Sequence, residues 1–398
     1  MSLMTIAFVF ILLSFLISNT VANGKLYISQ SQKKLIVVTF VLALYFVAHE
    51  FIFGDGLVSA KYCVFLLILC ISLMARYNVF FIFKILGYLG GGICFLLVAQ
   101  QLLLLSFDKG DISGLDVVIK GEDWGRWESC NFVKPFGIGL MERCDSGQIW
   151  LGEIGFNRSL FFSTEPKYIA SILLITLSSL LISSGSPSAR RFFIALHFIA
   201  LSFVLSASAI LIVLASWLLV YLRFVGPLMY TLLVFLFPVL VFPVVISYVV
   251  LGFELDGFLL NRAMSGASSI GSGELQNISI FGQAFGTCDD RLCRDSKGLI
   301  SNVIDTYGLL GLGIFGTFFY YVATPMFGFM KDELIPFSKK FALALMLNTY
   351  VVFNIYFFGD LFNMFGLLII LSIVLLPGYL SIRSSLSSES QSKLVVSR

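Results

Sequence analysis

Charged and polar residues that could bind an anion or move a proton gather in one long stretch, from Gly252 to about Gly316. Its cations are Arg262, Arg291, Arg294 and Lys297. The stretch closes with Asn302, Asp305 and Tyr307, directly before an apolar, glycine-rich segment. Ionisable groups at membrane depth are costly and are by default functional candidates. Arginine offers a permanent charge with bidentate donors and a carboxylate can accept a proton. The stretch therefore predicts a site for an anionic group and for proton transfer.

A second set of such residues lies where an earlier polar segment ends. Glu165 and Pro166 stand at the predicted start of an apolar helix, with Arg158 and Lys167 on either side. Proline favours the first helical turn, and a helix N-terminus flanked by cations would attract an anion. Glu165 could then act as an acid–base group or orient the arginine. The alternative is ordinary helix-start chemistry, with Arg158 and Lys167 as anchors at the membrane interface.

The elements that must position these residues are membrane helices. The chain is 58% hydrophobic and only 12% charged, whereas a soluble domain carries about 25% charged residues. Its apolar runs of about 20 residues predict an all-α polytopic membrane protein, with residues 1–398 forming a single transmembrane domain. Eleven spans are expected, at residues 3–22, 35–53, 57–75, 83–106, 167–184, 192–206, 208–222, 225–250, 299–323, 341–357 and 361–382.

One of these apolar runs is too long for a single span. Residues 192–222 would be about 46 Å long as one helix, which exceeds a hydrocarbon core of about 30 Å. A break is therefore expected at Ser206-Ala207-Ser208. By contrast, Gly90-Gly91-Gly92 lies within a span and is typical of close helix packing. These glycines are not followed by Lys-Ser or Lys-Thr, so a phosphate-binding loop is not predicted.

Basic residues set the orientation of the spans. If the N-terminus is outside and the C-terminus inside, one set of basic residues near the ends of the spans falls on the inner side. The outer side then holds 20 of the 23 acidic residues. That inner set is Lys25, Lys33, Lys34, Arg76, Lys84, Arg190, Arg191, Arg223, Lys331, Lys339, Lys340, Arg383, Lys393 and Arg398. Two large loops, residues 107–166 and 251–298, are then outside and are expected to carry the function. The Ser-rich residues 384–398 are expected to form a flexible inner tail.

Cysteine positions agree with this orientation. Each large outer loop has two cysteines and no inner loop has any, which suits an oxidising compartment. We predict a disulfide between Cys130 and Cys144 and another between Cys288 and Cys293. The alternative is four free thiols. No C-x-x-C spacing and no Asp-x-Asp pair occurs in a loop, so no required metal is expected.

Several short motifs, in this order, resemble the O-antigen polymerase and O-antigen ligase superfamily. The first is an arginine, an aromatic pair and a Glu-Pro that enters a helix, here Arg158 to Pro166. The others are Phe203-Val204-Leu205-Ser206-Ala207-Ser208, Asn261-Arg262-Ala263-Met264, Gly271-Ser272-Gly273, Phe281-Gly282-Gln283-Ala284-Phe285-Gly286, and Ser301-Asn302 through Tyr307-Gly308-Leu309-Leu310-Gly311. The resemblance covers about residues 156–320. It departs at Ala207 and Glu274, where many members have arginine.

The resemblance implies a GT-C-like glycosyltransferase in the bacterial inner membrane, multi-pass, with a periplasmic N-terminus and a cytoplasmic C-terminus. Its substrate, as donor and acceptor, would be an undecaprenyl-diphosphate-linked oligosaccharide in lipopolysaccharide biosynthesis. Membrane lipids and a chain-length regulator protein are the other expected partners, and no cofactor or nucleic acid is expected.

The resemblance also suggests roles for individual residues. Arg158 and Arg262 are the first choices for binding the diphosphate, because their forked donors suit its charge. The further substrate-binding candidates are Lys167, Arg291, Asn302 and Tyr307. Glu165 and Asp305 are the candidate catalytic bases for the acceptor hydroxyl. Asn302 and Asp305 could share a helix face. The alternative for Asp305 is a first-turn carboxylate that favours the helix dipole.

One departure separates the two branches of the superfamily. The ligase branch is expected to use a histidine as a base at the position where this chain has Ser301. The chain has only His49 and His197; neither lies near that motif, and we interpret both as structural. The missing histidine favours a polymerase over a ligase that moves chains onto a lipid A core.

A polysaccharide transporter or lipid flippase is the alternative from another functional class. Transporters often show internal repeats and charged groups or broken helices near the membrane midplane. We find no convincing repeat between the halves of this chain, and most of its ionisable residues lie in the two outer loops. The sequence therefore favours an enzyme.

Overall fold

Helices dominate the computed structural model of the chain. It describes residues 30–53, 63–70, 79–106, 130–133, 140–144, 149–151, 154–156, 158–161, 166–183, 187–204, 206–222, 225–235, 280–281, 299–353, 366 and 369–377. In this part of the chain, three helical stretches are long and apolar enough to cross a membrane: Gln32–Ile52, Ile85–Leu102 and Tyr307–Lys331. Two shorter apolar helices span Tyr168–Ile182 and Ser208–Tyr221. These helices are compatible with the predicted membrane protein.

The chain divides into two compact units, whereas the sequence predicts one transmembrane domain. Unit 1 comprises Met1–Val79, Tyr221–Pro336 and Tyr350–Arg398. Unit 2 comprises Phe80–Val220 and Phe337–Thr349. The second large loop thus belongs to unit 1, and the first large loop belongs to unit 2.

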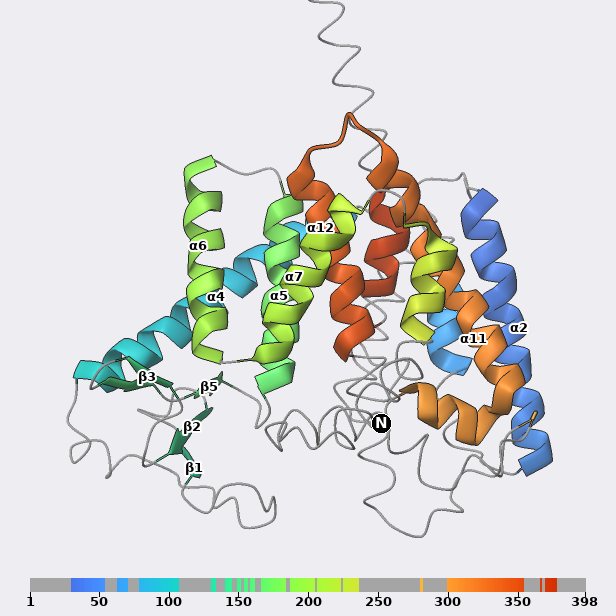
Figure 1. The fold of residues 1–398 in the computed structure, drawn as a ribbon, viewed down its shortest axis with the longest axis horizontal. Helices are drawn as coiled ribbons and strands as arrows, with labels where there is room; N and C mark the ends of the chain where they lie inside the picture. Colours follow the sequence, from blue (N-terminus) through green and yellow to red (C-terminus); the bar gives the residue numbers. More distant parts are fainter. Residues whose placement is uncertain are drawn as a thin grey trace, which may run out of the picture. The chain divides into compact units, whose positions relative to one another are not determined.

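In unit 1, helices α2 (Gln30–Phe53) and α11 (Leu299–Lys331) lie side by side (Figure 1). One stripe of α2 at helical spacing is buried, namely Leu35, Thr39, Leu42, Phe46 and His49. The rest of the helix exposes large apolar side chains, among them Val37, Phe40, Val41, Leu44, Val47, Phe51 and Ile52. A surface helix of a soluble protein places charged and polar residues there instead. The exposed apolar face of α2 is therefore suited to contact lipid.

Aromatic rings fix the position of α11 within unit 1. The ring of Phe319 stacks on Tyr230, with centroids 6.3 Å apart, and on Tyr350, also at 6.3 Å. Phe319 and Tyr350 are fully buried. Aromatic pairs add about 0.5–1.5 kcal/mol each beyond the area that they bury. The apolar part of α11 is thus held by stacked rings.

Unit 2 contains α4 (Val79–Ser106), α5 (Pro166–Ile182), α6 (Pro187–Val204), α7 (Ala207–Tyr221) and α12 (Phe337–Thr349). α5 lies against both α6 and α12 and is buried along most of its length. One buried hydrogen bond joins two helices of this unit: Asn348 Nδ2 on α12 donates to Ser216 Oγ on α7 at 3.0 Å. Such hydrogen bonds between helices are a common way to hold a membrane bundle together.

Two predicted helix boundaries are confirmed in unit 2. α6 ends at Val204 and α7 begins at Ala207, so the long apolar run is broken at the predicted place. The carbonyl of Ser206 accepts a hydrogen bond from the N–H of Ala209 at 3.0 Å, which starts the new helix. α5 begins at Pro166, directly after Glu165, in the first-turn position that proline favours.

His197 is part of the packing of unit 2, in agreement with its structural interpretation. The ring is fully buried, with Nδ1 2.7 Å from the carbonyl oxygen of Phe193 and Nε2 3.0 Å from Thr176 Oγ1. Because a carbonyl oxygen only accepts, Nδ1 carries a proton. The Thr176 hydroxyl also donates to the carbonyl of Leu173 at 3.1 Å, so its oxygen is shared between that carbonyl and the Nε2 atom. His197 thereby joins α6 to α5.

The glycine cluster of α4 permits close helix contact, as the sequence predicts. A Cβ atom added at Gly90 would overlap the Thr176 side chain of α5, and one added at Gly91 would lie 2.7 Å from Phe193 Cδ1 of α6. One added at Gly92 would meet nothing within 4 Å. Two of the three glycines are therefore needed for packing, and the third is not.

We expect Gly90→Ala to destabilise the protein by about 1–3 kcal/mol, because the added methyl group overpacks the contact with Thr176. The matched control is Gly92→Ala, for which helix propensity predicts no loss or a gain of up to about 1 kcal/mol. Thermal unfolding of the purified variants in detergent measures both effects. Equal unfolding temperatures for the two variants would contradict the close contact.

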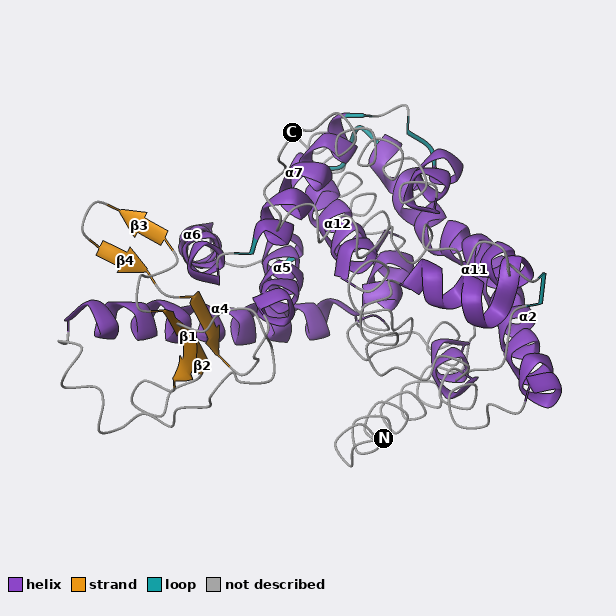
Figure 2. Cartoon of the chain, turned by 60° about the horizontal axis from the view of Figure 1, so that its bottom comes forward, coloured by secondary structure: helices purple, strands orange, loops and turns teal. Residues whose placement is uncertain are grey.

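The first large loop contains short β-strands, which the sequence did not predict. Strands β1 (Cys130–Val133), β2 (Leu140–Cys144) and β5 (Arg158–Phe161) form an antiparallel sheet in the order β1-β2-β5. Strands β3 (Ile149–Leu151) and β4 (Ile154–Phe156) form a separate antiparallel pair (Figure 2). Only two residues separate β3 from β4, a length typical of a tight hairpin. The loop is thus a small folded part and not a simple connection.

Candidate functional site at a broken helix

The main chain of α11 is broken at Gly308, directly after the predicted site residue Tyr307. Gly308 has φ 67° and ψ −170°, so two helical segments meet at this residue. A positive φ is readily adopted by glycine and disfavoured for other residues. The first segment, residues 299–307, contains Asn302 and Asp305, and the second begins the apolar stretch Tyr307–Lys331. The break therefore separates the end of α11 that carries Asn302 and Asp305 from its long apolar part.

The break leaves main-chain groups that other elements satisfy. In an unbroken α-helix, the carbonyl of residue 307 would accept from the N–H of residue 311. Here the hydroxyl of Tyr45, on α2, donates to the carbonyl of Tyr307 at 2.5 Å. The N–H of Leu310 donates to the carbonyl of Ile280 at 3.1 Å. Unpaired main-chain groups are costly in an apolar environment, so both bonds stabilise the break.

The contact with Ile280 brings part of the second large loop to the broken helix. Ile280 and Phe281 are the residues of that loop that the structure describes, and both side chains are exposed. The Tyr45 hydroxyl also lies 3.4 Å from the carbonyl oxygen of Phe281. Tyr45 thus stands between the loop and the break, at the junction of three chain segments.

Aromatic rings enclose Tyr307. Its ring centroid lies 4.7 Å from that of Phe46, 4.9 Å from that of His49 and 6.4 Å from that of Tyr45. Tyr307 is only 3% exposed. It was predicted to bind substrate, and its burial gives its ring a packing role at the break.

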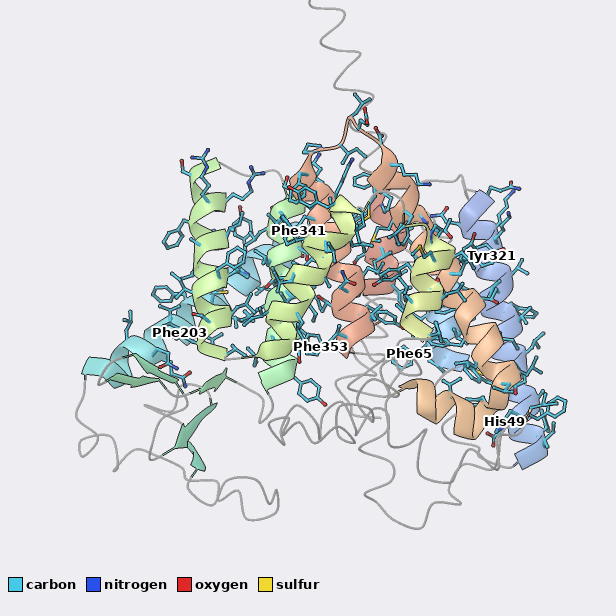
Figure 3. The ribbon with its side chains drawn as sticks, viewed as in Figure 1. His49, Phe65, Phe203, Tyr321, Phe341 and Phe353 are labelled. Atoms are coloured by element: carbon cyan, nitrogen blue, oxygen red, sulfur yellow. The ribbon has the colours of Figure 1, made fainter. Side chains whose placement is uncertain are left out.

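His49 corrects part of the sequence interpretation. It was placed far from the motif that begins at Ser301. His49 lies near one end of α2 (Figure 3), but its ring packs edge-on against Tyr307 of that motif, and only 3% of the residue is exposed. The next residue, Glu50, is half-buried and has one fully buried carboxylate oxygen, Oε2, with no hydrogen-bond partner among the described residues. Two ionisable residues at the end of an apolar helix are functional candidates.

Asp305 occupies a different place in its helix from the one predicted. α11 begins at Leu299, so Asp305 lies beyond its first turn. It lies three residues before the break, near the C-terminal end of the first segment. A negative charge is unfavourable at that end of a helix dipole. The position of Asp305 in α11 thus differs from the first turn that the alternative explanation assumed, and its role in the reaction stays a prediction.

Asn302 and Asp305 keep their predicted relation. Both lie in the helical segment 299–307, three residues apart, which places them on neighbouring turns of one face. Their roles as site residues stay a prediction.

In unit 2, the structure places two predicted cations by their main chain. Arg158 begins β5, where it is directly opposite Glu142 of β2. Lys167 lies in the first turn of α5. Glu165, Arg262, Arg291, Cys288 and Cys293 lie outside the described residues. The two loops belong to different units, so the expectation that they close over one cleft stays a prediction.

The sheet places the main chains of Cys130 and Cys144 directly opposite each other. Opposed residues of antiparallel strands have Cα atoms about 4.5–5.5 Å apart, a separation that a disulfide requires. We therefore expect mass spectrometry of alkylated, non-reduced protein to find Cys130 joined to Cys144, and also Cys288 joined to Cys293. Cys63, Cys70 and Cys94, which are free thiols in the structure, serve as controls. Four alkylated loop thiols would contradict both disulfides.

The sequence interpretation missed several residues of this site. Tyr45, Gly308 and Ile280 were not singled out, and His49 was set aside. A signal for α2 was present, because Phe46 and His49 continue the spacing of its buried stripe. Among the described residues, no group of three His, Cys, Asp or Glu residues is arranged to hold a metal ion.

Comparison of the chain with protein-family models, with curated proteins and with solved structures gave no match. The functional argument therefore rests on the residues and their geometry.

Proposed function

We propose that this protein is an O-antigen polymerase, an enzyme that joins undecaprenyl-diphosphate-linked oligosaccharide repeat units at the periplasmic face of the bacterial inner membrane. The observation that carries the proposal is the polar segment 299–307, which holds Asn302 and Asp305 directly before a helix break at the start of an apolar stretch. A lipid-linked substrate needs such a place, because its sugars are polar and its carrier is apolar.

The proposed architecture has eleven spans in a GT-C-like arrangement, with the N-terminus periplasmic and the C-terminus cytoplasmic. The large loops, residues 107–166 and 251–298, then both face the periplasm. This orientation is supported by the distribution of basic and acidic residues along the sequence. It would give both loops access to a donor whose diphosphate lies at the outer membrane surface.

The proposed reaction is a glycosyl transfer without a nucleotide sugar. The bond between the donor sugar and the diphosphate breaks, and undecaprenyl diphosphate leaves with the electron pair. The acceptor hydroxyl oxygen forms the new glycosidic bond, and its proton passes to Glu165 or Asp305. Arg158 and Arg262, assisted by Lys167 and Arg291, would stabilise the charge that develops on the diphosphate.

An O-antigen ligase is the second candidate, because one observation favours it. Ser301 stands where the ligase branch is expected to have a histidine, but His49 packs against Tyr307 of the same motif. A histidine is therefore present near the segment that would receive the acceptor, although it comes from α2.

Deletion of the gene, followed by gel analysis of the lipopolysaccharide, tests the proposal. A form with a single repeat unit, restored to a ladder by the wild-type gene, is the expected result for a polymerase. Loss of all O-chains with lipid-linked polymer retained would identify a ligase instead. Unchanged lipopolysaccharide would exclude both enzymes and favour a protein of another class.

A further inference from the structure

The hydroxyl of Tyr45 makes a hydrogen bond to the main chain at the break in α11. Its donor atom comes from α2, and its acceptor is the carbonyl of Tyr307, the last residue before Gly308. A carbonyl group at this position, at the start of an apolar stretch, would be costly if left unpaired. This carbonyl belongs to the last residue of segment 299–307. A hydroxyl that binds it therefore also fixes the direction in which the segment ends.

Further contacts make this arrangement specific. An added Cβ at Gly311 would lie 3.2 Å from Tyr45 Cε1 and would also overlap Tyr307 Cβ, so a glycine here leaves room for the tyrosine ring. Phe46 and His49 hold the Tyr307 ring from the same helix, α2. On the far side of the break, Leu310 is bonded to Ile280 of the second large loop.

We propose that Tyr45 is a positioning residue, whose hydroxyl sets the direction of segment 299–307 and thereby presents Asn302 and Asp305 to the acceptor sugar. This inference rests on the proposed function for the identity of the acceptor. Tyr45 does not touch the reacting atoms in this role. It acts through the carbonyl of Tyr307.

Tyr45→Phe removes the hydroxyl and keeps the ring. We expect kcat for polymerisation of lipid-linked repeat units by the purified protein to fall on the order of 10- to 100-fold, because small displacements of reacting groups have effects of this size. KM should stay close to the wild-type value, since the donor-binding arginines are unchanged. Hydrogen exchange of the peptide that covers residues 299–311 should become faster, because the end of the segment is released.

The matched control is Tyr321→Phe, on α11 itself. In the described part of the chain, the Tyr321 hydroxyl has no hydrogen-bond partner, while its ring packs edge-on against Tyr320. This variant should leave kcat and the exchange of residues 299–311 unchanged. A purely stabilising role for Tyr45 would lower the unfolding temperature of Tyr45→Phe but leave kcat per folded molecule at the wild-type value, and that result would overturn the proposal.

A second pair of variants covers the case in which Tyr45→Phe fails to fold. Gly311→Ala keeps the hydroxyl but places a methyl group against the rings of Tyr45 and Tyr307, and it should reproduce the loss of kcat and the faster exchange. Gly313→Ala is its control, because an added Cβ there meets nothing within 4 Å. Equal behaviour of these two glycine variants would also overturn the proposal.

The exchange measurement separates this inference from the proposed function. If the wild-type protein does not polymerise repeat units, the proposed function fails, and exchange alone decides whether Tyr45 holds the segment. Faster exchange at residues 299–311 in Tyr45→Phe, but not in Tyr321→Phe, then supports the positioning role. Unchanged exchange in both variants overturns it.

Discussion

Replacing Arg158 or Arg262 with alanine is expected to abolish polymerisation, with a loss of at least about 100-fold. Each arginine would supply a permanent charge and forked donors to the diphosphate as its bond to the sugar breaks. Arg→Lys should restore activity only in part, because lysine keeps the charge but lacks the fork. Chain-length ladders on a lipopolysaccharide gel, at matched protein levels, measure the effect.

Two controls make this experiment specific. Substitution of Lys25 or Arg383, which lie on the predicted inner side, should affect topology or yield at most. For Arg158 the structure suggests a further control, because this residue is directly opposite Glu142 in the sheet. If Arg158 serves only as a cross-strand partner, Glu142→Ala should reproduce the loss. Normal ladders from either arginine-to-alanine variant would remove that arginine from the site.

The second large effect is expected at the two carboxylates. Glu165→Gln and Asp305→Asn should each give a folded protein that has lost about 100- to 10,000-fold in activity, the usual contribution of a general base. Glu165 is the preferred essential residue, since it directly precedes Pro166 at the start of α5. Assays of purified variants with lipid-linked repeat units, together with thermal unfolding, separate loss of activity from loss of fold.

For Asp305 the structure sharpens the expected outcome. A carboxylate that served the helix dipole from a first turn would contribute about 0.3–1 kcal/mol to stability and little to activity. Asp305 is instead close to the C-terminal end of segment 299–307, where its charge opposes the dipole. Asp305→Asn is therefore expected to leave stability unchanged or slightly raised while activity falls. If both amide variants polymerise at near wild-type rates, no carboxylate base acts at these positions, and the mechanism rests on the arginines and on positioning.

Features that depend on nearby residues were predictable from the sequence. The start of α5 at Pro166 follows from the fixed φ of proline. The break at Ser206 follows from the length of an apolar run compared with a membrane. The close contact at Gly90 follows from a cluster of small residues within a span. In each case the physical cause lies in a few consecutive residues or in the length of one apolar run.

The sheet of the first loop was not predictable in this way. The pairing of Cys130 with Cys144 and of Arg158 with Glu142 depends on the register of three strands. Register is set by the face that a strand buries and by its turns, and strands of three to five residues have too little periodicity to reveal either. The strands of this loop were not predicted for that reason.

The broken helix was decided by the tertiary structure alone. In the sequence, Gly308 is one of several glycines before an apolar segment, and glycine permits a positive φ without requiring one. The break is stabilised because a hydroxyl group 262 residues away, on Tyr45, donates a hydrogen bond to the carbonyl of Tyr307 beside it. The same packing brings His49 to Tyr307. A main-chain group in an apolar environment must be paired, and which residue pairs it is settled only when α2 and α11 lie together.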